Sequence, residues 1–182
     1  MIKFTQHDTF SKDESTNSDM GAAATPQMLI VCEDFFECDV DGFTDNATPC
    51  LWFDIGCCRL ITNDSTGELS GDGRVIAQDP VVCMKYGSWA PIIQEYLYSG
   101  KNVPKIGLRR LSSINGTKVI IQEVNYEICL MKTYRQKDDT IEFTFSAITV
   151  EDINILYDNT GTKIGNTGTK FDYSTMLVTT SS

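Results

Sequence analysis

The sequence predicts a mainly β fold, a small β-barrel of two packed antiparallel sheets with one α-helix. Amphipathic strands follow one another after residue 100, and one short helical stretch precedes them. Asn115 and Gly116 form a dipeptide that favours a two-residue hairpin between neighbouring strands. A chain of 182 residues is long enough to bury one core, so we expect a single barrel domain over residues 27–182.

The N-terminal residues 1–26 differ in composition from the rest of the chain. They are mostly polar, and they end in a small-residue stretch, 21–26, that resembles a hinge. Such a segment cannot bury enough apolar surface to order itself. Ile2, Phe4 and Phe10 are the apolar exceptions, so we expect a flexible or partner-docking extension.

The charge balance excludes some classes of partner. The formal net charge is -10, which argues against nucleic acid because phosphate contacts need clustered Lys and Arg. No stretch approaches the roughly 20 apolar residues of a membrane span. Residues 1–8 lack the basic-then-apolar layout of a signal peptide. We expect assembly in the cytoplasm, and any export by a route that reads no signal peptide.

The cysteine pattern favours reduced, small apolar side chains. The chain has 7 cysteines, an odd number, at positions 32, 38, 50, 57, 58, 83 and 129. A disulfide that involves Cys32, Cys38 or Cys50 stays an open alternative. Adjacent Cys57 and Cys58 do not have the spacing of a zinc site, and the single histidine, His7, lies in the polar extension. We therefore expect no metal, no cofactor and no enzymatic activity.

The sequence before the helix predicts extended segments separated by turns. Residues 28–32 and 51–61 are typical of buried strands, and Gly56 within the second indicates a bulge or a close backbone approach. Residues 62–74 contain three glycines and three acidic residues, which predicts a loop. Pro80 makes the following extended run an edge strand or a broken one.

The helix is predicted between residues 88 and 100. Ser88 is a plausible N-cap, Pro91 falls in the first turn, and Gly100 stands where a left-handed C-terminal residue belongs. Ala90, Ile93 and Leu97 form one apolar stripe along it. We expect this stripe to pack on the core.

The strands after the helix carry the candidate subunit interface. We expect strands at 106–111, 118–122, 124–131 and 141–146, then a loop over 158–168 and a last strand at 171–178. Ile141, Phe143 and Phe145 should share one buried face. The strand 124–131 is uncharged or apolar on most of both faces, as expected either for a strand half covered by a neighbouring subunit or for the central strand of a sandwich. The candidate interface residues are Val124, Tyr126, Ile128, Cys129 and Met131.

This order of elements resembles the Hcp tube proteins of type VI secretion systems. In that family a Gly-rich segment, here 71–79, leads into a strand and then into a serine–proline helix that ends in glycine, here Ser88 to Gly100. Strands 105–110, 125–128 and 142–146 and the closing segment 158–173 follow the same spacing. The resemblance covers about residues 28–178. It departs in the extra residues 1–26, in Trp89 and Ala90 within the serine–proline motif, and in the number of cysteines.

The resemblance implies a structural subunit without a cofactor. Its partners would be copies of itself in a homohexameric ring, further rings stacked into a tube, and the sheath proteins, spike protein and effector cargo of a contractile injection apparatus. Sheath contraction would expel the tube. A projecting glycine-rich loop is a plausible ring-to-ring contact, and its candidate stacking residues are Gly67, Glu68, Leu69, Gly71, Asp72 and Gly73. A phage tail tube protein and a monomeric β-sandwich binding module are the alternatives.

Overall fold

The computed structural model describes residues 27–37, 40, 45–59, 62–63, 69–70 and 75–181. The strands and the helix among these residues are β1 (Met28–Val31), β2 (Ala47–Pro49), β3 (Trp52–Arg59), β4 (Thr62–Asn63), β5 (Leu69–Ser70), β6 (Val75–Lys85), α1 (Ala90–Ser99), β7 (Asn102–Ile114), β8 (Thr117–Lys137), β9 (Thr140–Tyr157), β10 (Lys163–Asp172) and β11 (Leu177–Ser181). The predicted mainly β fold with antiparallel pairing and a helix is confirmed.

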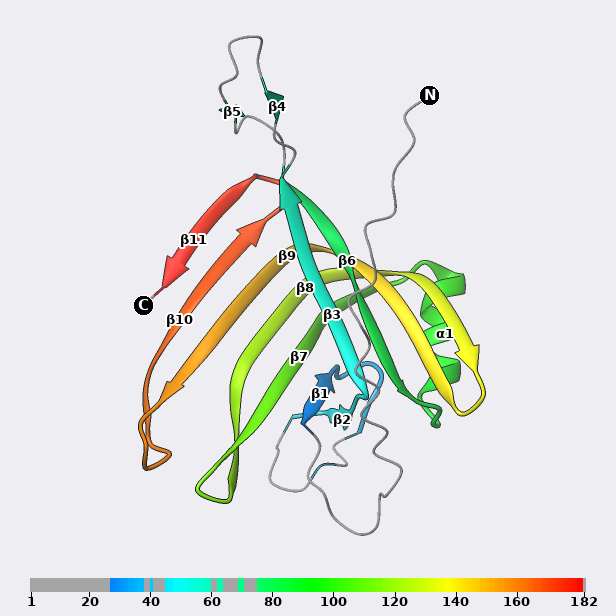
Figure 1. The fold of residues 1–182 in the computed structure, drawn as a ribbon. Helices are drawn as coiled ribbons and strands as arrows, with labels where there is room; N and C mark the ends of the chain where they lie inside the picture. Colours follow the sequence, from blue (N-terminus) through cyan, green and yellow to red (C-terminus); the bar gives the residue numbers. More distant parts are fainter. Residues whose placement is uncertain are drawn as a thin grey trace.

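The main sheet is one antiparallel path that branches at β9. Its strand order is β11-β10-β9-β8-β7-β1-β2, and β6 joins it to β3. The edge of β9 that does not contact β8 has two partners in turn. Residues 140–144 pair with β6, and residues 149–157 pair with β10. The β3–β6 ribbon therefore leaves the path near residue 146 and crosses over it as the second layer of the barrel (Figure 1).

The core lies between these layers and under α1. Ile141, Phe143 and Phe145 are fully buried and share one face of β9, as predicted. Tyr126 from β8 packs edge-on against Phe145, with 5.1 Å between ring centroids. The ring of Phe36 extends the core toward the helix, where it meets Trp89.

The helix ends as predicted but begins one residue later. Gly100 adopts a left-handed conformation, φ 64°, and donates its N–H to the carbonyl of Tyr96 at 3.0 Å. Pro91 lies in the first turn, and Ala90 and Ile93 are buried with Leu97 partly buried against the core. The N-cap residue is Trp89, without a side-chain cap, so the prediction of Ser88 is wrong. The Trp89 ring instead packs edge-on against Phe36.

The alternation of inward-facing and outward-facing residues is interrupted once in each of β7, β8 and β9, at the same level of the sheet. At that level two successive inward-facing residues are three positions apart, whereas regular alternation places them two apart. The inward residues there are Val103 and Ile106 in β7, Tyr126 and Cys129 in β8, and Ala147 and Val150 in β9. The pairing register places Pro104, Ile128 and Ile148 side by side at this level. We call these three residues the shift row.

The backbone of Ile128 is strained at the shift row. Ile128 has φ 54°, which is an outlier for a β-branched side chain. An extra residue in a strand bends it and increases its twist. Because three neighbouring strands carry the extra residue together, the sheet can curve as a unit, and β8 and β9 bend across the molecule (Figure 1).

Several predicted boundaries differ from the structure. Residues 118–122 and 124–131 belong to one strand, β8, and the predicted loop 158–168 contains the start of β10. Residues 171–178 are divided by a turn at 173–176. The predicted loop 62–74 contains the paired strands β4 and β5. Pro80 does not break β6. Asp54 pairs with Val81 and Gly56 pairs with Gln78, so Asp79 and Pro80 together oppose Ile55 and the extra residue lies in β6. The irregularity predicted at Gly56 is therefore next to this glycine, but the bulged strand is its partner.

The helix packing predicts a sharp contrast between two adjacent isoleucines. Ile93 is 0% exposed and Ile92 is 36% exposed. Ile93→Ala should lower the free energy of unfolding by about 2–5 kcal/mol because it opens a cavity in the core. The control Ile92→Ala should stay within about 0.5 kcal/mol. Urea unfolding measures both, and equal losses would mean that α1 faces the core differently.

The shift row predicts a stabilising glycine. Ile128→Gly should raise the free energy of unfolding by about 1 kcal/mol, since glycine adopts a left-handed conformation without the steric cost. The control is Leu130→Gly, because Leu130 is also exposed on β8 but has no positive φ. That change should lower the stability by about 0.5–1 kcal/mol. Destabilisation by both changes would contradict the strain at Ile128.

Candidate assembly surfaces

The candidate interface strand is central, and most of its candidate residues face the core. β8 pairs with β7 on one edge and with β9 on the other, which is the sandwich alternative left open by the sequence. Val124, Tyr126, Cys129 and Met131 are buried within the protomer, whereas Ile128 is 49% exposed. Their burial leaves these four side chains little surface for a neighbouring subunit, and the interface role of the strand stays a prediction.

Exposed apolar side chains surround Ile128. Ile148 lies across from it on β9, Leu130 follows it on β8, and these two are 39% and 41% exposed. Pro104 completes this outer apolar patch on β7. Sequence reasoning missed Pro104, Leu130 and Ile148 as surface residues because strict alternation placed Leu130 on the buried face.

The strand edges are the second candidate surface. β11 lies at one end of the sheet path and β2 at the other, and no further strand of the described residues pairs with either outer edge. All residues of β11 are exposed. Unpaired N–H and C=O groups on such edges can pair with another chain. The two ends therefore offer different surfaces for a head-to-tail contact between copies.

The candidate stacking residues are mostly outside the described part of the chain. Gly67, Glu68, Gly71, Asp72 and Gly73 are among the residues left undescribed. Leu69 belongs to β5 and pairs with Asn63 of β4. The β4–β5 pair projects beyond the ends of β3 and β6 (Figure 1). A stacking role for this segment stays a prediction.

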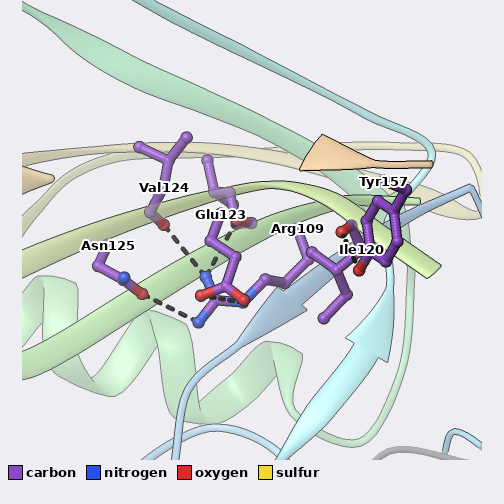
Figure 2. A network of polar contacts seen from close by, with 7 residues as sticks. Arg109, Ile120, Glu123, Val124, Asn125 and Tyr157 are labelled. Atoms are coloured by element: carbon purple, nitrogen blue, oxygen red, sulfur yellow. Dashed lines mark hydrogen bonds and ion pairs between the residues drawn. The ribbon is translucent and has the colours of Figure 1, made fainter. Parts of the chain in front are cut away.

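A buried arginine fixes the register between β7 and β8. One terminal nitrogen of Arg109 donates to the carbonyls of Leu108 and Val124, and the other donates to Oδ1 of Asn125 at 2.9 Å (Figure 2). Its Nε lies 3.9 Å from the Glu123 carboxylate. Burial lowers the pKa of the Arg109 guanidinium, and the charge of Glu123 opposes that shift.

A glycine makes room for this network. A Cβ on Gly107 would lie 2.8 Å from a terminal nitrogen of Arg109, so the guanidinium rests where a side chain would stand. Arg109 also lines a cavity of about 460 Å³ together with Lys105 and the acidic residues Glu33, Asp34 and Asp45. Acidic and basic side chains both line this cavity, and Arg109 is already bonded to β8, which indicates a structural role for it. The adjacent Arg110 is exposed, with its guanidinium over the ring of Phe53.

An apolar cleft opens where β6 separates from β9. We call this cavity of about 420 Å³ the branch cleft. The residues that line it are Ile55, Gly56, Cys57, Val75, Gln78, Asp79, Pro80, Val124, Tyr126, Ser146, Ala147, Val150, Asp152, Thr169, Phe171, Tyr173 and Val178. Residues from both layers of the barrel line it, so it lies between the layers at the edge of the core.

One ion pair closes the polar side of the branch cleft. The Asp79 carboxylate accepts hydrogen bonds from Nζ of Lys132 and from Oγ of Ser146, each at 2.5 Å. Burial raises the pKa of Asp79, but these two partners outweigh it and hold the pKa below its ordinary value. Because Asp79 is already paired, the cleft presents mainly apolar surface to an occupant.

The described cysteines behave as buried apolar residues, apart from Cys57. Cys32, Cys50 and Cys129 are buried free thiols, and Cys57 is an exposed one. Burial raises the pKa of the three buried thiols to about 12. Within the described residues, no cluster of three or more His, Cys, Asp or Glu side chains could hold a metal ion. No helix in the same residues is long and apolar enough to cross a membrane.

Solved structures with the same fold identify the architecture. One, described as a type six secretion system protein, superposes with TM-score 0.72 at 15% identity and covers 84% of this chain and 98% of its own. Hcp1 from Salmonella typhimurium gives TM-score 0.62 at 13% identity, with coverages of 84% and 97%. The chain has an Hcp-like fold.

Further Hcp structures agree with this assignment. Hcp1 from E. coli EAEC 042, in a mutant form, gives TM-score 0.59 at 11% identity and covers 87% of this chain and 99% of its own. In all three comparisons the match spans at least 97% of the other chain. No family model matches the sequence, and no curated protein matches it in sequence.

The thiol environments predict selective alkylation. At pH 8 in the native protein, Cys57 should react quickly with iodoacetamide, whereas Cys32, Cys50 and Cys129 should stay unmodified until the chain unfolds. Mass spectrometry of the digested protein assigns each site. Rapid native labelling of Cys129 would contradict its burial.

The same thiols predict a loss of stability at alkaline pH. Their pKa is raised from 9.0 to about 12 by burial, so above pH 9 the unfolded chain binds fewer protons than the folded one. Their contribution to the free energy of unfolding is fully present below pH 9 and falls as the pH rises toward 12. The Cys129→Ala variant should show a shallower decline in urea unfolding between these limits.

Proposed function

We propose that this protein is the structural subunit of the inner tube of a contractile injection apparatus. In this proposal six copies form a ring, rings stack into a tube, and sheath contraction expels the tube with its spike protein and effector cargo. The observation that carries the proposal is the Hcp-like fold over 84% of the chain, shared with a solved type six secretion system protein. Assembly takes place in the cytoplasm, and the tube leaves through the contractile apparatus.

The strand edges support the ring. Contact between the β11 edge of one copy and the β1–β2 end of the next is head-to-tail, and such contacts form a closed ring when the rotation between copies closes. Pairing would also remove two exposed sheet edges, which are an aggregation hazard in a lone protomer. The outer apolar patch around Ile128 gives the same assembly further surface to bury.

Electron microscopy of the purified protein tests the tube and its stacking segment together. The wild-type protein should form rings, and light scattering should give six times the protomer mass. Replacement of residues 66–72 by a short Gly-Ser linker should leave rings intact and prevent tubes, because stacking needs contacts along the ring axis and ring closure does not. A matched control replaces Asp138 and Asp139, in the β8–β9 turn, with Gly and Ser and should retain both rings and tubes.

Two outcomes would contradict parts of this proposal. A monomer at high protein concentration would overturn the tube subunit itself. Long tubes from the linker variant would overturn only the stacking role of residues 66–72.

A further inference from the structure

The branch cleft has the properties of a site for apolar side chains. Its volume of about 420 Å³ lies within the usual range of ligand pockets. Ile55 and Val75 line it from the β3–β6 ribbon, and Phe171 and Val178 line it from β10 and β11. Val178 is 58% exposed although it borders the core. The uncovered apolar wall points to an occupant with apolar side chains on one face.

The described chain begins within reach of this part of the barrel. The carbonyl of Gln27, the first described residue, accepts the N–H of Leu111, and the carbonyl of Met28 accepts the N–H of Cys50. β3 begins immediately afterwards, and Ile55 and Cys57 of this strand line the branch cleft. At about 3.3 Å per strand residue, the cleft begins roughly 17–23 Å from the point where the chain enters the structure.

Residues 1–5 carry the side-chain pattern that the cleft requires. Ile2 and Phe4 alternate with Lys3 and Thr5, so an extended backbone places both apolar side chains on one face. Residues 5–26 connect this stretch to Gln27, and a tether of that length could span about 3.3–3.6 Å per residue, far more than the distance to the cleft. The other edge of β3 has no partner strand among the described residues, so it can accept an added strand.

We propose that residues 1–5 of the same chain lie along the free edge of β3 and place Ile2 and Phe4 in the branch cleft. Lys3 then faces outward on the side of Asp54, which is exposed on β3 and carries the opposite charge. The tether keeps the segment at a high effective concentration near its own cleft. The proposal concerns the protomer and is independent of whether the protein forms rings.

Photo-crosslinking of the full-length protein tests the position of Phe4. A benzophenone amino acid that replaces Phe4 should crosslink to peptides from β10 and β11 that contain Phe171 or Val178. The same amino acid in place of Lys3 is the matched control and should give no crosslinks to these cleft peptides, because it faces outward. Mixing isotope-labelled and unlabelled protein separates crosslinks within one chain from crosslinks between chains.

Each outcome decides the proposal. Crosslinks from position 4 to the cleft within one chain support it. Crosslinks to the cleft of another chain would overturn docking in the same protomer, and crosslinks elsewhere, or none, would overturn docking in the cleft.

A fluorescence measurement gives an independent readout. Phe4→Asp should expose the branch cleft and raise the fluorescence of an added apolar dye, whereas Thr5→Asp, with the same charge on the outward face, should leave it unchanged. Circular dichroism should show that both variants keep the wild-type strand content. Equal dye fluorescence from the two variants would overturn the proposal.

Discussion

The shift row is the constraint on which the rest of this structure depends. If side chains alternated strictly along β7, β8 and β9, the apolar residues beyond the bend would point away from the core. One extra residue in each strand, at Pro104, Ile128 and Ile148, restores the inward face on both sides of the bend. The same bend allows β9 to exchange β6 for β10 as its partner. The free-energy cost of the left-handed backbone at Ile128 is therefore offset by the burial of apolar side chains in a continuous core.

The change of partner along β9 also creates the surfaces that are available for contacts. Where β6 departs, neither ribbon covers the gap, and the branch cleft remains between them. The ion pair of Asp79 and Lys132 closes its polar side and stabilises the point of separation. On the opposite face the Arg109 network holds β7 and β8 in register. A barrel whose described strands leave free edges at both ends of the sheet path is the kind of unit that can assemble by repetition of a single contact.

The sequence predicted those features that depend on neighbouring residues. Asn115–Gly116 formed the expected hairpin turn, and Gly100 took the left-handed conformation that its position indicated. The sequence-based predictions failed where packing between distant residues determines the local structure. The glycines at 165 and 168 suggested a loop, yet both lie in β10, and a Cβ on Gly168 would come within 3.2 Å of the Asp152 carbonyl. The buried positions Cys129 and Met131 could not be assigned because no local signal marks an extra residue shared by three strands.

The topology has a consequence for how the chain is synthesised. β1 pairs with β7 through Leu29 and Arg109, and β6 pairs with β9 through Val81 and Thr144. The first strands to leave the ribosome therefore wait for partners made much later, while their apolar residues stay uncovered. Non-local pairing of this kind slows folding and exposes a nascent chain to aggregation. The consecutive hairpins from β7 to β11 pair locally, so this half of the barrel is the natural template on which the earlier strands are assembled.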